Sequence, residues 1–213
     1  MCAGVILKAL RATFCHPDRV VSIHPCVYAG MPLWLKCFFI IRLSLRLSMV
    51  KITGKKRHSI RKSQIEDLFS SLEREIGESA SLFRGASVEL LETSSGEILY
   101  LIDRKPQLMQ GDGFVFPTLK GLLEHPFPER RVVVDAGAVS FVINGADVMR
   151  PGIISLSEDI VAGRPVQVVE ERHKKPLALG MALFDSREMR ERKQGKVIKT
   201  FHYVGDDLWN LEF

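Results

Sequence analysis

Three glycines and one arginine within residues 134–152 have types and spacing that suit binding to the backbone of another polymer. Gly137, Gly145 and Gly152 lack a Cβ, so a sugar-phosphate chain could approach the main chain closely at these positions. Arg150 could place its guanidinium beside such a chain, as arginine does in contacts to phosphate. The alternative is that the glycines only serve turns. The stretch carries no side-chain set for catalysis, so the chemistry it predicts is binding.

Short elements must position this surface. Residues 131–134 carry three consecutive valines and predict a strand. Asp135 can cap the turn that follows, and residues 138–142 place apolar side chains at helical spacing before residues 144–145 (Asn-Gly) stop the helix. Residues 147–152 then turn the chain sharply. The pattern is therefore a strand, a short helix and a glycine-proline turn in immediate succession.

The flanking sequence predicts one compact mixed barrel and a separate half before it. Further strands are expected at residues 165–170, 176–184 and 196–204, with a helix over 187–193 that Ser186 caps and that ends near Gly195. Upstream, we expect a helix from an N-cap at Ser63 to Gly77, followed by a hairpin of residues 87–91 and 97–102. An extended stretch over 107–116, with a turn at 111–113, and a short helix over 117–125 should come next. The boundary between the two halves is expected near Glu129.

Several separated motifs, in one order, carry a resemblance to a known family. They are residues 117–120 (PTLK), 125–127 (HPF), 134–153 (VDAGAVSFVINGADVMRPGI), 178–180 (ALG) and 201–209 (FHYVGDDLW). The stretch 134–153 resembles part of a PUA domain. The ordered set resembles the malignant T-cell amplified sequence and translation machinery-associated family with its archaeal relatives, in which a pre-PUA domain precedes PUA.

The resemblance implies an α+β fold, with an α/β pre-PUA domain over residues 49–129 followed by a PUA-type mixed pseudo-barrel over residues 130–213. It also implies a cytoplasmic RNA-binding protein without catalysis, acting in translation on the small ribosomal subunit beside a partner translation factor. The RNA is then structured, either ribosomal RNA or the acceptor end of a tRNA. One alternative is an accessory subunit of a tRNA or rRNA modification enzyme, such as a pseudouridine synthase or archaeosine transglycosylase. Another is a protein-interaction module without RNA contact.

The resemblance and the residue types together define a candidate RNA-binding set. Within it, the arginines and lysines would neutralise phosphate, the glycine backbone would supply shape contacts, and His202 would stack on an unpaired base. For the lysine pair the alternative is a solvated turn, and for His202 it is simple packing. The set is Gly137, Ala138, Asn144, Gly145, Asp147, Val148, Met149, Arg150, Pro151, Gly152, Arg164, Lys174, Lys175 and His202.

Charge is distributed unevenly along the chain. The formal net charge is +5, and residues 1–48 supply all of it, with six Lys or Arg and one Asp. The remaining residues carry 24 basic and 24 acidic side chains, so the body is neutral. Residues 51–62 nevertheless hold six basic residues and no acidic ones. This predicts a basic arm that draws in phosphate or merely forms a solvated helix entry; its members are Lys55, Lys56, Arg57, Arg61 and Lys62.

The sequence argues against several other classes of protein. The four cysteines all lie in the first 48 residues, at spacings that fit no zinc site or redox pair. The histidines show no short metal spacing, and no phosphate loop or nucleophile elbow occurs, so no metal, cofactor or catalytic residue is assigned. No apolar run reaches the length of a membrane span. Residues 1–48 themselves are interpreted as a disordered extension or as a start assigned upstream of a true initiation at Met49.

Overall fold

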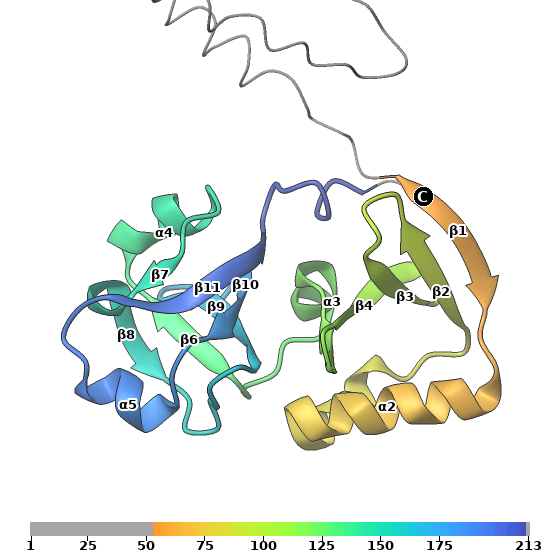
Figure 1. Ribbon diagram of the computed structural model, residues 1–213, viewed down its shortest axis with the longest axis horizontal. Helices are drawn as coiled ribbons and strands as arrows, with labels where there is room; N and C mark the ends of the chain where they lie inside the picture. Colours follow the sequence, from red (N-terminus) through yellow and green to blue (C-terminus); the bar gives the residue numbers. More distant parts are fainter. Residues whose placement is uncertain (1–52, 212–213) are drawn as a thin grey trace, which may run out of the picture. The chain divides into compact units, whose positions relative to one another are not determined.

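The computed structural model describes residues 53–211, and of Lys55 only the backbone. Lys51–Phe213 forms one compact unit. Within the described range the strands are arranged in two sheets, one of five strands and one of six, with helices packed against them (Figure 1). This mixture of helices and sheets confirms the predicted α+β class. The interpretation of residues 1–48 lies outside the described residues, and the division at residue 129 stays a prediction.

The first sheet is an antiparallel meander built from consecutive strands. Its order is β1-β2-β3-β4-β5, and its helices are α2, the 3-10 helix η3, and α3. The bounds are β1 Gly54–Ser59, α2 Lys62–Ile76, η3 Gly77–Phe83, β2 Val88–Thr93, β3 Ile98–Ile102, β4 Lys105–Gly111, β5 Phe114–Pro117 and α3 Leu119–Glu124. The predicted hairpin, the extended stretch and the short helix are therefore all present.

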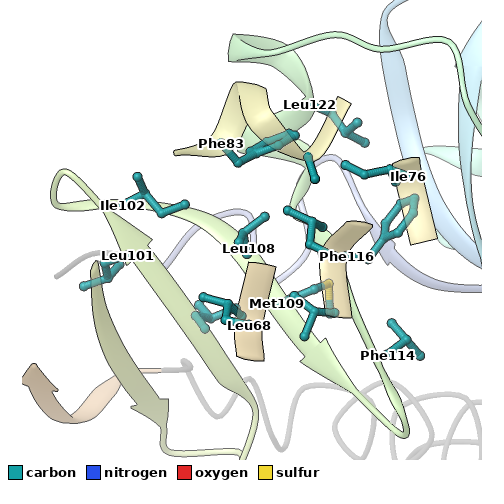
Figure 2. Close-up of a cluster of buried hydrophobic side chains, with 14 of the residues drawn as sticks. Leu68, Ile76, Phe83, Leu101, Ile102, Leu108, Met109, Phe114, Phe116 and Leu122 are labelled. Carbon is teal, nitrogen blue, oxygen red and sulfur yellow. The ribbon is translucent and has the colours of Figure 1, made fainter. Parts of the chain in front are cut away.

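Helix α2 covers this sheet with an apolar face. Leu68, Leu72 and Ile76 recur at helical spacing and are buried against strand residues such as Leu108 and Phe116 (Figure 2). The helix ends at Gly77, as predicted, where the backbone has φ 60°. Its start was predicted wrongly, because the helix begins one residue before Ser63.

The N-cap of α2 is Arg61, whose backbone N–H donates to Gln64 Oε1 at 3.0 Å. The glutamine three residues on thus satisfies the N-cap backbone, as in one half of a capping box. A serine is a favoured N-cap residue, but here the side chain of Gln64 meets the local requirement instead.

The basic segment before α2 differs from the predicted arm. Residues 54–59 form β1, an edge strand that pairs with β2 and has no second neighbour in the described sheet. Arg57 pairs with Glu89 on β2, while Lys56, Arg61 and Lys62 are exposed. Exposed lysines are common on edge strands because their charge discourages a further strand from pairing. These cations are therefore presented by a sheet edge and the helix entry, and not by a free arm.

The second sheet is mixed and curls into a half-barrel. Its order is β7-β11-β10-β9-β6-β8, with β6 and β9 parallel and the other pairs antiparallel. The bounds are β6 Arg131–Val134, α4 Ala136–Val142, β7 Val148–Met149, η4 Arg150–Gly152, β8 Ile153–Leu156, β9 Pro165–Glu170, β10 Pro176–Ala182, α5 Ser186–Glu191 and β11 Lys196–Tyr203. Helix α5 starts after Asp185 and not after Ser186, which is its first residue.

A buried ion-pair cluster ties the start of the second sheet to α2. The side chain of Glu75 is 4% exposed, and its two oxygens lie 3.1 Å from Arg130 Nη2 and 2.9 Å from Arg164 Nη1. Arg130 Nε also donates to the Glu75 carbonyl at 2.7 Å. Burial lowers the pKa of Arg130 from its usual value, although Glu75 and Asp159 oppose that shift. The guanidinium still stays charged at neutral pH, so Glu75 is its charge partner.

A turn after β11 packs against the apolar core of the first sheet. Asp206 accepts hydrogen bonds from the backbone N–H groups of Tyr203 and Trp209, and its Oδ2 lies 2.7 Å from His202 Nδ1. The turn delivers Leu208 and Leu211 into the core that α2 and the first sheet build. One carboxylate therefore organises the segment that carries these two leucines.

Asp206→Asn is expected to destabilise the protein near neutral pH and to have little effect in acid. Burial alone would raise the pKa of the Asp206 carboxyl, but His202 and the two backbone N–H groups hold that pKa below its ordinary value. A lowered folded-state pKa gives stability that is present above the unfolded value and is lost as pH falls through the folded value. The melting temperatures of the wild type and of Asp206→Asn should therefore converge as pH falls, and thermal melts from pH 7 to pH 2 would measure this.

The exposed neighbour offers a matched control for that prediction. Asp207→Asn removes the same charge one residue away, from a side chain that is exposed. It should shift the melting temperature little at any pH. A constant gap between the wild-type and Asp206→Asn melting temperatures down to pH 2 would contradict the role assigned to the ionised carboxylate.

Candidate nucleic-acid interface

Helix α4 is positioned by the strand before it and by its own cap. Val132 and Val134 are fully buried in β6, and the Asp135 side chain accepts a hydrogen bond from the Ala138 N–H at 2.7 Å. The cap satisfies a backbone donor at the helix start, as the sequence predicted. The helix buries Val142 in the core and leaves Phe141 67% exposed. An aromatic ring of that exposure offers a π-face at the surface.

An open hollow of about 470 Å³ lies between α4 and the β7-η4 turn. A volume in the range of roughly 300–1,000 Å³ is typical of ligand sites. Its lining is mostly apolar and includes Phe141, Val142 and Ala146 beside much of the predicted set. The structure thus brings together, at one hollow, the predicted residues Gly137, Ala138, Asp147, Val148, Met149, Pro151 and Gly152.

Lys196 of β11 contacts Asp147 in the wall of this hollow, and the charge of Lys199 acts on the same carboxylate. Asp147 Oδ2 lies 3.1 Å from Lys196 Nζ, and its Oδ1 accepts the Thr200 N–H at 2.9 Å. Burial is the largest single influence and raises the pKa of Asp147, but Lys196, the Thr200 N–H and the charge of Lys199 together outweigh it and lower the pKa overall. Asp147 is therefore ionised at neutral pH. The hollow has a negative group in its wall and cations at its edge.

The glycines of the predicted surface have different uses. Gly145 has φ 79°, and a Cβ there would lie 2.7 Å from the Tyr203 ring, so a side chain is excluded by strain and by packing. A Cβ at Gly152 would come within 3.0 Å of Ala138 Cβ. At Gly137 a Cβ would meet only its neighbour Asp135, at 3.2 Å. Only Gly137 leaves backbone open to an approaching ligand, while the other two fit the protein itself.

Arg150 is directed away from the hollow. Its Nε donates to the Met189 carbonyl at 2.6 Å, and its Nη1 donates to the Ile153 carbonyl at 3.1 Å. Met189 is fully buried in α5. Two donor directions of the guanidinium are therefore already committed to the protein backbone. The sequence favoured a phosphate contact here because it shows the charge of Arg150 and not its partners.

Arg164 and His202 likewise have partners within the protein. Arg164 Nη1 contacts Glu75 Oε1 and donates to the Gly113 carbonyl at 3.3 Å. His202 is 2% exposed and bonded to Asp206, so its ring has no face at the surface for a base to stack on. Asn144 likewise points back, since its Nδ2 donates to the Ser140 carbonyl.

The β9-β10 turn lies on the other side of α4. A second hollow, of about 270 Å³, is lined by α4 residues Ala136 and Val139 and by residues 170–173. Lys174 and Lys175 follow in the same turn and are exposed, with Lys174 at φ 56°. The predicted lysine pair is thus presented beside the helix that carries Phe141, although the two lysines do not line the larger hollow.

Comparison with known proteins places this geometry in a family. The PUA domain model matches residues 130–204, which include both hollows. An uncharacterized protein of Methanocaldococcus jannaschii is 41% identical over 159 residues, covering 74% of this chain and 98% of that protein. Translation machinery-associated protein 20 of Saccharomyces cerevisiae is 32% identical over 134 residues, covering 59% of this chain and 73% of the yeast protein. This chain belongs to the translation machinery-associated protein 20 family.

A solved structure extends the family fold over both sheets. A hypothetical protein from the hyperthermophilic archaeon Pyrococcus horikoshii matches with a TM-score of 0.67 and 33% identity, covering 73% of this chain and 98% of that protein. The match confirms the predicted order of an α+β first half followed by a PUA-type half-barrel. Together with the PUA match and the yeast relative, it confirms the family resemblance that the ordered motifs predicted.

The described part of the chain has neither a cluster of metal-ligating side chains nor a helix suited to span a membrane. Within residues 53–211, no three His, Cys, Asp or Glu side chains converge in a way that could hold a metal ion. The same range contains no helix with the length and hydropathy of a membrane span.

Sequence reasoning missed three residues at the larger hollow. Phe141 was noted only as an apolar position at helical spacing, and Lys196 and Lys199 were not singled out. The sequence did contain a signal for Phe141. Phe141 and Val142 are neighbours on a helix of about two turns, so their side chains lie on different faces and only one of those faces can be buried in the core. No local signal existed for the lysines, because Lys196 comes beside Met149 only through the pairing of β11 with β7, and Lys199 acts on Asp147 from the same distant strand.

Proposed function

We propose that this protein binds RNA in the translation apparatus without catalysing a reaction, through the larger hollow of its PUA domain. The family carries the link to translation, since the yeast relative is named a translation machinery-associated protein. The observation that carries the site is the hollow itself, with Phe141 exposed at its wall and lysines at its edge. The proposal places the protein in the cytoplasm, on the small ribosomal subunit and beside a partner translation factor.

The chemistry of the hollow favours an unpaired base over a phosphate group. Its lining is largely apolar, and stacking on an aromatic ring stabilises a base of any sequence. Among the described residues, the lining contains no cation for a phosphate to pair with, and Asp147 in the wall is ionised and already paired with Lys196. Lys196, which contacts Asp147, and Lys199, whose charge acts on that carboxylate, would then be near the sugar-phosphate chain of a base seated inside. The base is thus bound within the hollow and its backbone is held outside.

This division of roles suits an RNA end or loop. Bases in a duplex are stacked and paired, whereas single-stranded ends and loops can turn a base outward. The acceptor end of a tRNA and an exposed ribosomal RNA loop both meet that requirement. Additional contacts to the same RNA come from Lys174 and Lys175 beside α4, and from the exposed cations of β1 and the α2 entry, Lys56, Arg61 and Lys62.

Lys199→Gln is expected to weaken RNA binding and to reduce its dependence on salt. Each neutralised phosphate of a single strand contributes about 0.7 to the slope of log affinity against log salt concentration. We therefore expect the magnitude of the slope for a short single-stranded RNA to fall by about 0.7. Fluorescence anisotropy titrations at several salt concentrations would measure both the affinity and the slope.

Arg74→Gln is the matched control for this experiment. It removes one positive charge from an exposed side chain of α2 that does not line the larger hollow, and it should leave the slope unchanged. Equal slopes for wild type, Lys199→Gln and Arg74→Gln would exclude the β11 edge as the phosphate contact. Co-purification separates the biological settings: ribosomal subunits support the proposal, while a pseudouridine synthase or transglycosylase would favour an accessory role in RNA modification.

A further inference from the structure

On the β7-η4 side of the larger hollow, the residues that line the wall are not consecutive in sequence. Met149, Pro151 and Gly152 line it, but Arg150 between them does not. A short 3-10 turn of three residues has little stability of its own. Something outside the turn must therefore hold its lining residues against α4.

Arg150 supplies that support from both its backbone and its side chain. Its N–H donates to the Gly195 carbonyl at 2.9 Å, Nε donates to the Met189 carbonyl at 2.6 Å, and Nη1 donates to the Ile153 carbonyl at 3.1 Å. The first two carbonyls belong to α5 and to the loop between α5 and β11. Met189 is fully buried, so the anchor point is itself fixed in the core of the second sheet.

We propose that Arg150 is a positioning residue of the proposed RNA site, which sets the wall of the hollow by fastening the 149–152 turn to α5 and contacts no phosphate. This inference rests on the proposed function, since it concerns the same hollow. It replaces the role that charge alone suggested for this arginine. It also makes α5, which lines no part of the hollow, a structural support for RNA binding.

The planar guanidinium is essential to this role, and its positive charge alone is not. The two carbonyls belong to residues 39 and three positions away in sequence, and the fork reaches both with separate N–H groups. A lysine ammonium is a single centre on a flexible stem and does not reproduce this pair of bonds. Arg150→Lys therefore keeps the positive charge but loses the two hydrogen bonds to the carbonyls. The variant thus distinguishes a phosphate contact from a positioning role.

The test compares Arg150→Lys and Arg150→Met, titrated with a short fluorescein-labelled single-stranded RNA at several salt concentrations. We expect both variants to raise Kd by about tenfold, the equivalent of losing one charge-assisted hydrogen bond. The salt slope should remain that of the wild type in both. Wild-type affinity in Arg150→Lys, together with a shallower slope in Arg150→Met, would overturn the proposal and restore a phosphate contact.

A second readout and a stability control keep the result interpretable. Hydrogen exchange at the Arg150 and Ile153 amides, whose acceptors are the Gly195 and Arg150 carbonyls, should accelerate in both variants before any RNA is added. Ile160→Val, a buried substitution in the same core, lowers stability without touching the turn and should leave Kd unchanged. If Ile160→Val weakened binding equally, or exchange stayed unaltered, a specific positioning role would be refuted. Failure of the proposed function can be distinguished from failure of this inference, because in that case the wild-type protein itself would not bind the RNA.

Discussion

Glu75→Gln is expected to lower the free energy of unfolding by about 3–5 kcal/mol, the range seen when one member of a buried ion pair is removed. The carboxylate of Glu75 serves two guanidinium groups, from Arg130 and Arg164, and its side chain is almost fully buried. Glutamine keeps the shape but offers one oxygen, and its amide N–H₂ then faces an arginine donor. Chemical denaturation with urea would measure the change.

The loss arises mainly from Arg130. Its side chain is 9% exposed, and Nη1 already lacks a hydrogen-bond partner in the described structure. Without Glu75, the buried positive charge loses the carboxylate that acts on it most strongly and keeps only the weaker influence of Asp159, while burial is already the largest influence on its pKa. Arg164 suffers less, since its side chain is 45% exposed and it also donates to the Gly113 carbonyl.

Two further variants make this prediction sharp. Glu73→Gln removes an exposed carboxylate of the same helix, 3.9 Å from Arg84, and should change stability by less than about 0.5 kcal/mol. The double change Glu75→Leu with Arg130→Met removes both buried charges and should recover much of the stability, as apolar replacement of buried pairs does. An unfolding free energy for Glu75→Gln within error of the Glu73→Gln value would show that the cluster contributes little.

Phe141→Ala is expected to weaken binding of single-stranded RNA by about tenfold or more. Removal of an aromatic platform costs about 1–3 kcal/mol for each stacked base, and tenfold in affinity corresponds to about 1.4 kcal/mol. The ring lines the larger hollow and is 67% exposed, so it is available to a base without rearrangement. For the same reason the substitution should change the free energy of unfolding by less than about 0.5 kcal/mol. Anisotropy titrations and urea denaturation measure the two quantities.

The controls for Phe141 distinguish stacking from general loss of apolar surface. Leu82→Ala shortens an exposed side chain of η3, 46% exposed, and should leave RNA affinity unchanged. Phe141→Trp retains a ring and should bind at least as well as the wild type, whereas Phe141→Leu keeps bulk without a π-face and should bind weakly. Equal affinities for the alanine, leucine and tryptophan variants would remove the aromatic platform from the proposed site.

Local signals in the sequence predicted the elements around the site closely. The valine run at β6, the Asp135 cap, the helical spacing of α4 and the turn at Gly145 all act over a few residues, and the structure has each where it was expected. Strand β9 also has its predicted bounds. Such features depend on backbone propensity and nearest-neighbour hydrogen bonds, which the chain encodes locally.

The local pattern was less informative where a partner came from elsewhere in the chain. Residues 54–59 were interpreted as a basic lead into a helix, but they form an edge strand because β2, more than 30 residues later, pairs with them. Strand propensity depends strongly on such partners, and one glycine followed by five polar or charged residues carries little of it alone. The local pattern was also insufficient at the first turn of α2, where the capping side chain is that of Gln64 and not that of Ser63.

What the sequence determined by itself is the family, the order of the elements and the stretch that builds the hollow. Only the tertiary structure decided which cations face a ligand. Arg150, Arg164 and His202 have the residue types of an RNA site, yet they meet carbonyls or carboxylates of the protein. Strand β11 instead places Lys196 beside Met149 and in contact with Asp147 of the hollow, and the charge of Lys199 acts on the same carboxylate. A charge acts over a few ångströms, and the groups within that distance are set by packing between segments far apart in the chain.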